Sequence, residues 1–173
     1  PFIRLFGTNG FLVLHVLVLL ASFVCAYAFL VARSQPAAAL VFALAFVFVS
    51  VAPVYLVWLT PDLFNLGLVT LGYFFWLYKE VASPQTPAGQ TRSVWIVGPR
   101  TDLVAALWLG LATFSKPTHV LLMFPVLGLF ALRRQWRRGF VCGVVFSAVV
   151  LGFFGANIAI TGEYNFQGGD RKT

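Results

Sequence analysis

The sequence predicts an all-α protein: a polytopic transmembrane helix bundle of about six spans, some of them short or kinked. Of its 173 residues, 60% are hydrophobic and only 10% are charged, whereas an average soluble domain carries about 25% charged residues. Long apolar runs recur along the chain, and short segments rich in charges and prolines separate them. So few charges suit a lipid solvent, in which apolar exteriors are favoured.

Two long spans are expected first. The run 11–32, interrupted mainly by His15 and Ser22, reaches across the ~30 Å hydrocarbon core at ~1.5 Å per residue. Pro36 is placed to begin the second span, 37–59, because the first helical turn needs no N–H donor there. Pro53 lies inside that span and predicts a kink.

The remaining spans are mostly shorter, and two of the segments have alternative interpretations. The turn Thr60-Pro61-Asp62 begins a third span, 63–78, and residues 79–101 are expected to form a cytoplasmic loop. The apolar segments 103–114 and 120–132 are either two short or tilted spans or a re-entrant pair, and the two-span interpretation agrees better with the cation count. A last span, 139–160, leads into the start of an extracytoplasmic loop, 162–173.

The orientation follows from the cations, because cytoplasmic loops of membrane proteins are enriched in Lys and Arg. Six spans divide the twelve cations of the chain eight to four. The cytoplasmic set is Arg33, Lys79, Arg92, Arg100, Arg133, Arg134, Arg137 and Arg138, and the outer set is Arg4, Lys116, Arg171 and Lys172. The four arginines of 133–138 lie between two apolar runs, so they indicate a membrane anchor, and no nucleic acid is expected as a partner.

Some features limit what the chain can do alone. It lacks an initiator Met and its ends resemble loops, so we expect an internal fragment of a longer protein, with 1–173 forming a single transmembrane domain. Cys25 and Cys142 lie in apolar runs and form no metal motif. No nucleophile triad, phosphate-binding loop or zinc spacing is present.

Asp62 is the first candidate site residue. It lies in the first turn of a helix that points inward from the outer face, where a helix dipole alone favours an acid. The functional interpretation is a carboxylate that orients a sugar hydroxyl or binds a metal ion. No cofactor is otherwise indicated, and a divalent cation stays open as the alternative.

The second and third candidates lie in the outer loops. Lys116 and His119 flank Pro117 in the turn 115–119, where Lys116 either snorkels to water or binds a phosphate. The tail 162–173 mixes charges, amides, aromatics and glycines, which suits either a loop over a polar ligand or a solvated loop. Its candidate substrate-binding residues are Asp170, Arg171 and Lys172.

Three stretches resemble the polytopic GT-C glycosyltransferases, in particular bacterial relatives of the protein O-mannosyltransferases and of the lipid A aminoarabinose transferase. They are the opening Phe2-Ile3-Arg4-Leu5-Phe6-Gly7, the segment from Tyr55 to Asn65 that ends a span in Thr-Pro-Asp, and Ala112-Thr113-Phe114-Ser115-Lys116-Pro117-Thr118. The last leads through a span to the basic turn 133–138.

The resemblance implies transfer of a sugar from a polyprenyl-phosphate carrier to a glycan, lipid or protein acceptor outside the cytoplasm, in a bacterial inner (plasma) membrane. It also implies a carboxylate general base in the family's first outer loop, upstream of Pro1, so the fragment alone is expected to be inactive. Asp62 matches an acidic position that closes a later outer loop, and Lys116 stands where the family often has a cation before Pro.

The residues of the chain are also compatible with two other functions. A secondary transporter would also contain broken helices and polar residues within its spans, although ionisable groups are rare in these spans and transporters usually need some near the midplane. A membrane assembly subunit without chemistry is a third possibility that the composition also allows.

Overall fold

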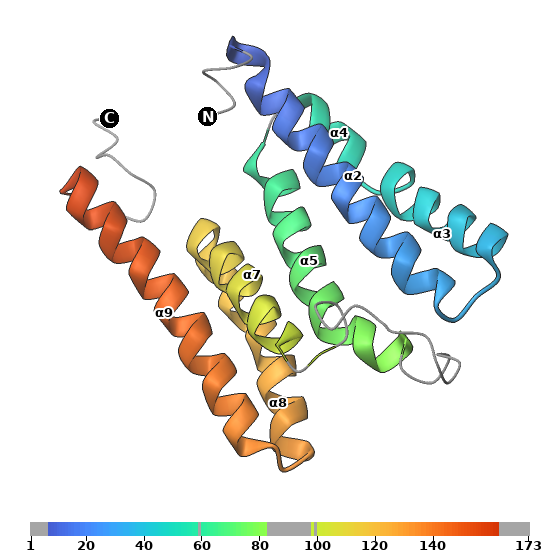
Figure 1. Ribbon diagram of the computed structural model, residues 1–173. Coiled ribbons are helices and arrows are strands. Elements are labelled where there is room, and N and C mark those ends of the chain that lie inside the picture. Colours follow the sequence, from blue (N-terminus) through green and yellow to red (C-terminus); the bar gives the residue numbers. More distant parts are fainter. Residues whose placement is uncertain (1–6, 59, 83–97, 99, 163–173) are drawn as a thin grey trace. The chain divides into compact units, whose positions relative to one another are not determined.

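The chain is all-helical throughout the residues that the computed structural model describes, which are 7–58, 60–82, 98 and 100–162 (Figure 1). In chain order the helices are η1 (Gly7–Asn9), α2 (Gly10–Val31), α3 (Pro36–Phe48), α4 (Ala52–Trp58), α5 (Pro61–Ala82), α7 (Thr101–Ser115), η3 (Pro117–Met123), α8 (Phe124–Leu132) and α9 (Trp136–Thr161). η1 and η3 are 3₁₀-helices.

Prolines set several of these boundaries. Pro36 and Pro61 begin α3 and α5, as the sequence predicts, because Pro has no N–H to lose in a first turn. The kink expected near Pro53 is a full break between α3 and α4. There Ser50 Oγ donates to the Val47 carbonyl and accepts a hydrogen bond from the Ala52 N–H, at 3.0 and 3.2 Å.

Three helical segments extend beyond the apolar runs from which they were predicted. α5 continues to Ala82, beyond the expected limit of 78, because Lys79 and Glu80 are good helix formers and the Arg33 side chain binds the last carbonyls. α9 begins at Trp136 rather than 139. The segment expected over 120–132 begins at Pro117, whose ring fits the first turn of η3.

The chain divides into two compact units, Pro1–Ala105 and Ala106–Thr173. In the first unit α2 packs chiefly against α5 and α3, and α2 and α5 run in the same direction (Figure 1). They approach closely at Gly67, where an added Cβ would lie 2.1 Å from Val18 Cγ1. Small residues permit such contacts between helices.

The second unit contains most of α7 together with η3, α8 and α9. Gly110 on α7 lies against Val149 on α9, where an added Cβ would meet the Val149 Cβ at 2.9 Å. The rings of Phe114 and Phe153 pack with centroids 5.5 Å apart. Gly139 on α9 similarly receives the Phe130 side chain of α8, at 3.2 Å from an added Cβ.

Two of the described helices, α2 and α9, are long and apolar enough to cross a membrane. The shorter apolar segments are α3, α7 and the combined η3–α8 stretch, Pro117–Leu132. At ~1.5 Å per residue the 15 residues of α7 extend about 22 Å, less than a ~30 Å hydrocarbon core. The choice between two spans and a re-entrant pair therefore stays a prediction.

Candidate functional site

The N-terminus of α5 gathers polar groups at one end of the first unit. Asp62 occupies the first turn of α5 and is half-buried. Asn65, one turn further on, is 4% exposed, and its Oδ1 has no hydrogen-bond partner in the part of the chain described here. Thr60 Oγ1, just before the helix, is likewise a buried atom without a hydrogen-bond partner among the described residues. A helix N-terminus favours negative charge, so this end suits a carboxylate and offers two acceptor oxygens beside it.

At the opposite end of the first unit, two of the described cations, Arg33 and Lys79, make fixed contacts. Arg33 lies in the turn after α2, and its Nε and Nη2 donate to the Val81 and Glu80 carbonyls at 3.1 and 3.3 Å. Arg33 and the end of α5 therefore lie at the same end of the unit, and the assignment of this end to the cytoplasm stays a prediction.

Lys79 reaches α7 at this same end. Its ammonium forms an ion pair with Asp102 Oδ1, and the two side chains are 16% and 3% exposed. Asp102 stands in the first turn of α7, where the helix dipole also favours an acid. The sequence alone did not single out Asp102; the signal for it was an acid directly after Thr101 at the start of an apolar run.

Lys116 and His119 share one turn in the second unit. Lys116 is exposed and precedes η3, and its backbone N–H donates to the Ala112 carbonyl at 2.9 Å. His119 N–H donates to the Lys116 carbonyl at 2.9 Å, and its ring Nδ1 lies 3.2 Å from the Ala112 carbonyl. This ring nitrogen therefore ties the turn to the end of α7, which leaves Nε2 as the nitrogen for a ligand.

The predicted site residues fall into separate groups. Lys116, just before η3, and His119, in the first turn of η3, come together. Asp62 belongs to the first unit, and the sequence-based expectation that it lies near the turn 115–119 stays a prediction. Asp170, Arg171 and Lys172 lie outside the described residues. Within the described ranges no three His, Cys, Asp or Glu side chains are grouped as a metal site.

Asn65 and Thr60 were missed as candidates from the sequence. An Asn in an apolar helix one turn after Asp62 was the available signal, but its burial depends on tertiary packing. From the sequence, His15 on α2 is expected to be an interfacial or packing histidine; it is 4% exposed, and its Nδ1 is buried without a partner in the described part of the chain.

The chain matches no protein-family model, no curated protein and no solved structure. The case for a function therefore depends on the chain's own residues.

Proposed function

We propose that the chain is a multi-pass integral membrane protein of about six spans, of the bacterial inner (plasma) membrane. The polarity of α2 supports this, since it is the reverse of that in a water-soluble protein. Its buried residues are Gly10, His15 and Ser22. Its exposed side chains are large and apolar: Phe11, Leu12, Val16, Leu17, Leu20 and Val24. An exterior of this kind is favourable in lipid and unfavourable in water.

The hydroxyl groups of the helices agree with a lipid solvent. Ser22, Thr70, Thr113 and Thr161 each donate to the carbonyl four residues earlier, at 2.8–2.9 Å. Such back-bonding satisfies a hydroxyl without water, and a bilayer core supplies no water to do so.

Within this membrane protein we assign the two ends of the first unit to opposite faces. Cytoplasmic loops carry the excess of Lys and Arg, and Arg33 and Lys79 lie at the end where α5 terminates. Asp62 then faces the outside. Two single-cysteine variants in a background without Cys25 and Cys142 test this. Thr60→Cys should react with an impermeant maleimide from outside intact cells, and Gln135→Cys should react only after permeabilisation; the reverse pattern would overturn the orientation.

The function we propose is sugar transfer, as part of a GT-C type glycosyltransferase that moves a sugar from a polyprenyl-phosphate carrier to an extracytoplasmic glycan, lipid or protein. The observation that carries it is the position of Asp62 in the first turn of α5, at the end of the unit opposite the cations. There an acceptor carboxylate can orient a sugar or acceptor hydroxyl. Lys116 provides a point charge for the carrier phosphate.

The test compares cells that make the protein with cells from which its gene is deleted. Loss of the protein should raise the amount of polyprenyl-phosphate sugar and remove that sugar from its acceptor. Wild type should restore transfer, and Lys116→Gln should restore it poorly while its amount in the membrane is unchanged. The exposed Arg138→Gln change is the matched control and should restore transfer fully. Unchanged carrier and acceptor pools after deletion would contradict a transferase.

A secondary transporter is the second candidate, and one observation favours it. His15 Nδ1 and Asn65 Oδ1 are buried in apolar helices and lack partners among the described residues, as groups along a solute or proton path would. In that case deletion would abolish uptake of a solute while the polyprenyl-phosphate sugar pool stays constant. His15→Leu would then impair uptake, whereas a transferase should tolerate it if folding is preserved.

A further inference from the structure

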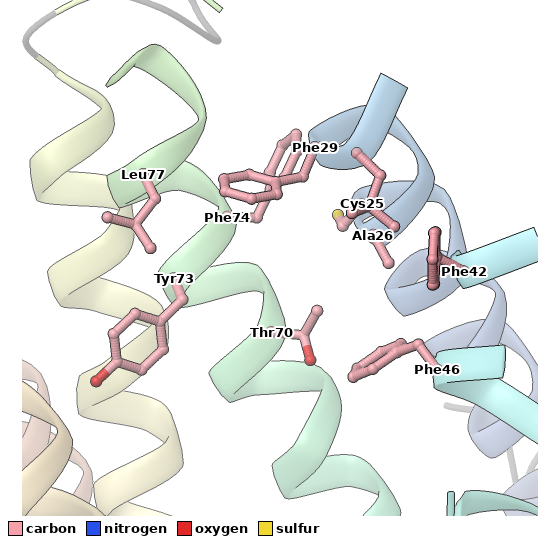
Figure 2. A pocket seen from close by; sticks show the side chains of 10 residues that line it. Cys25, Ala26, Phe29, Phe42, Phe46, Thr70, Tyr73, Phe74 and Leu77 are labelled. Carbon is pink, nitrogen blue, oxygen red and sulfur yellow. The ribbon is translucent and has the colours of Figure 1, made fainter. Parts of the chain in front are cut away.

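The first unit contains an apolar groove between α2, α3 and α5, with a volume of about 430 Å³ (Figure 2). This lies within the range of about 300–1,000 Å³ that is typical of ligand sites. Five aromatic rings and one thiol form most of its wall: Phe29, Phe42, Phe46, Tyr73, Phe74 and Cys25. An open apolar groove of this kind is unfavourable in water and suits an apolar occupant.

The chemistry of the wall selects a hydrocarbon. Two residues of the wall, Thr70 and Tyr73, carry a hydroxyl group. Thr70 lies on α5 and faces Phe46 (Figure 2), and its Oγ1 already donates to the Leu66 carbonyl at 2.8 Å. In Figure 2 the Tyr73 hydroxyl points away from Cys25 and Phe46. A polar ligand would lose its hydration here without gaining hydrogen bonds, whereas an apolar chain would not.

The groove is open where α3 forms its edge. Phe42 and Phe46 are 63% and 41% exposed, so the opening joins the apolar surface that faces lipid in the proposed membrane protein. A chain from the bilayer can therefore enter from the side, without separating α2 from α5.

Arg33 lies at one end of the groove. Leu30 on α2 and Leu77 on α5 belong to the wall, and Arg33 follows Leu30 by one turn. Its guanidinium bonds to the carbonyls of Glu80 and Val81, one turn beyond Leu77. The exposed guanidinium carries five N–H donors, and these two bonds hold it in place across the end of the groove.

An exposed cation at this end can contact an anion. Among the described residues here, Lys79 pairs with Asp102, whereas the guanidinium of Arg33 is exposed beside the groove and has more N–H donors than its two carbonyl partners use. Arg matches the geometry of phosphate oxygens, and the cytoplasmic leaflet, to which this end is assigned, is the one rich in anionic lipids.

We propose that the groove binds one acyl chain of an anionic phospholipid of the cytoplasmic leaflet, whose phosphate contacts Arg33. This rests on the membrane insertion and orientation proposed above but not on sugar transfer. The lipid would fill the space between α2, α3 and α5 and so complete the packing of the first unit.

Photo-crosslinking in lipid nanodiscs tests the proposal. The protein is reconstituted in phosphatidylcholine with a trace of phosphatidylglycerol that carries a diazirine in its acyl chain, and labelled residues are mapped by mass spectrometry. Labels should concentrate on residues 25–30 and 42–46. Ala26→Phe, which fills the groove, should reduce them at least fivefold. Ala38→Phe, an exposed change on α3 outside the groove, is the matched control and should not.

The headgroup is tested separately. Arg33→Gln should lower labelling by phosphatidylglycerol about fivefold, the effect expected of one cation near an anionic leaflet, to the level of labelled phosphatidylcholine. Arg33→Lys should retain most of the difference. Thermal unfolding of each variant in the nanodisc verifies that it is folded, and Ala26→Leu provides a milder filling if Ala26→Phe is not.

Several outcomes would overturn the proposal. If residues all around α2 were labelled equally and Ala26→Phe did not change this labelling, the lipid contact would be non-specific and the groove would not be a binding site. Stronger competition by polyprenyl phosphate than by phosphatidylglycerol would assign the groove to the carrier instead. If the lipid labelled neither α2 nor α9, the proposed membrane insertion would be wrong as well. A failure to detect sugar transfer, in contrast, would not affect the lipid-binding result.

Discussion

The two ends of the first unit hold their polar groups in different ways. Where α5 terminates, charges are engaged: Arg33 binds backbone carbonyls and Lys79 pairs with Asp102. Where α5 begins, half-buried Asp62 lies between Thr60 and Asn65, whose side-chain oxygens are buried without partners in the described chain. Buried polar atoms without partners are costly and call for an explanation. The first end is organised for stability and orientation, and the second retains hydrogen-bonding capacity that a ligand can use.

The largest effect on stability should come from breaking the ion pair. Asp102→Ala leaves the Lys79 ammonium largely buried without a partner, which should lower the free energy of unfolding by about 3 kcal/mol. The double change Lys79→Met with Asp102→Leu should recover part of the loss, because no uncompensated charge remains. Denaturant titration in mild detergent measures both. A loss no larger than that of Asp62→Ala would remove the difference between the two ends.

Close packing midway between the two ends should give the next effect. A Cβ at Gly67 would lie 2.1 Å from Val18 Cγ1, so Gly67→Ala should destabilise by about 2 kcal/mol through overpacking. Val18→Ala in the same chain should restore much of the stability by making room. The control is Gly152→Ala on α9, where no atom lies within 4 Å of the added Cβ. Its effect should be neutral or favourable by up to about 1 kcal/mol.

A smaller loss is expected at Arg33. Arg33→Gln removes two hydrogen bonds to the end of α5, and because the side chain is exposed the cost should be about 1 kcal/mol. Arg138→Gln is the matched control, since Arg138 is exposed and, among the described residues, its side chain makes a long hydrogen bond to Gln135, at 3.5 Å. It should change the melting temperature little. Equal shifts for the two variants would mean that Arg33 does not stabilise the end of α5.

The sequence located what depends on local chemistry and missed what depends on tertiary partners. Pro36, Pro61 and the break near Pro53 follow from the covalent geometry of proline, so these boundaries could be predicted. The end of α5 could not, because Lys79 reads as a loop residue until its partner Asp102 is known. Helix extension there depends on contacts from segments distant in sequence.

The candidate site divides in the same way. Asp62 and Lys116 stand out from the sequence because charges are rare in the chain. The burial of Asn65 depends on which face of α5 is covered, and the contact of Gly67 with Val18 depends on the register of two parallel helices. Hydropathy reveals neither the covered face of α5 nor the register of the two helices. The helix α2 is apolar on nearly all sides, and its few polar residues are buried.

The smallest expected change in stability is the one that bears most directly on function. Asp62 stands in the first turn of α5, so replacing it by Asn should cost only about 0.3–1 kcal/mol of helix-dipole stabilisation. If the carboxylate orients a hydroxyl during sugar transfer, the same change should reduce turnover about 10²-fold, because small losses of positioning are expensive in rate. The neutral amide keeps the size of the side chain but replaces one acceptor oxygen by a donor, so a loss of rate reports on charge and acceptor capacity rather than on packing. Transfer rate and thermal unfolding should be measured on the same preparation, with Asp102→Ala as the reference for a variant that acts through stability. Normal turnover with a slightly lowered melting temperature would assign Asp62 to helix stabilisation alone, and both ends of the first unit would then be structural.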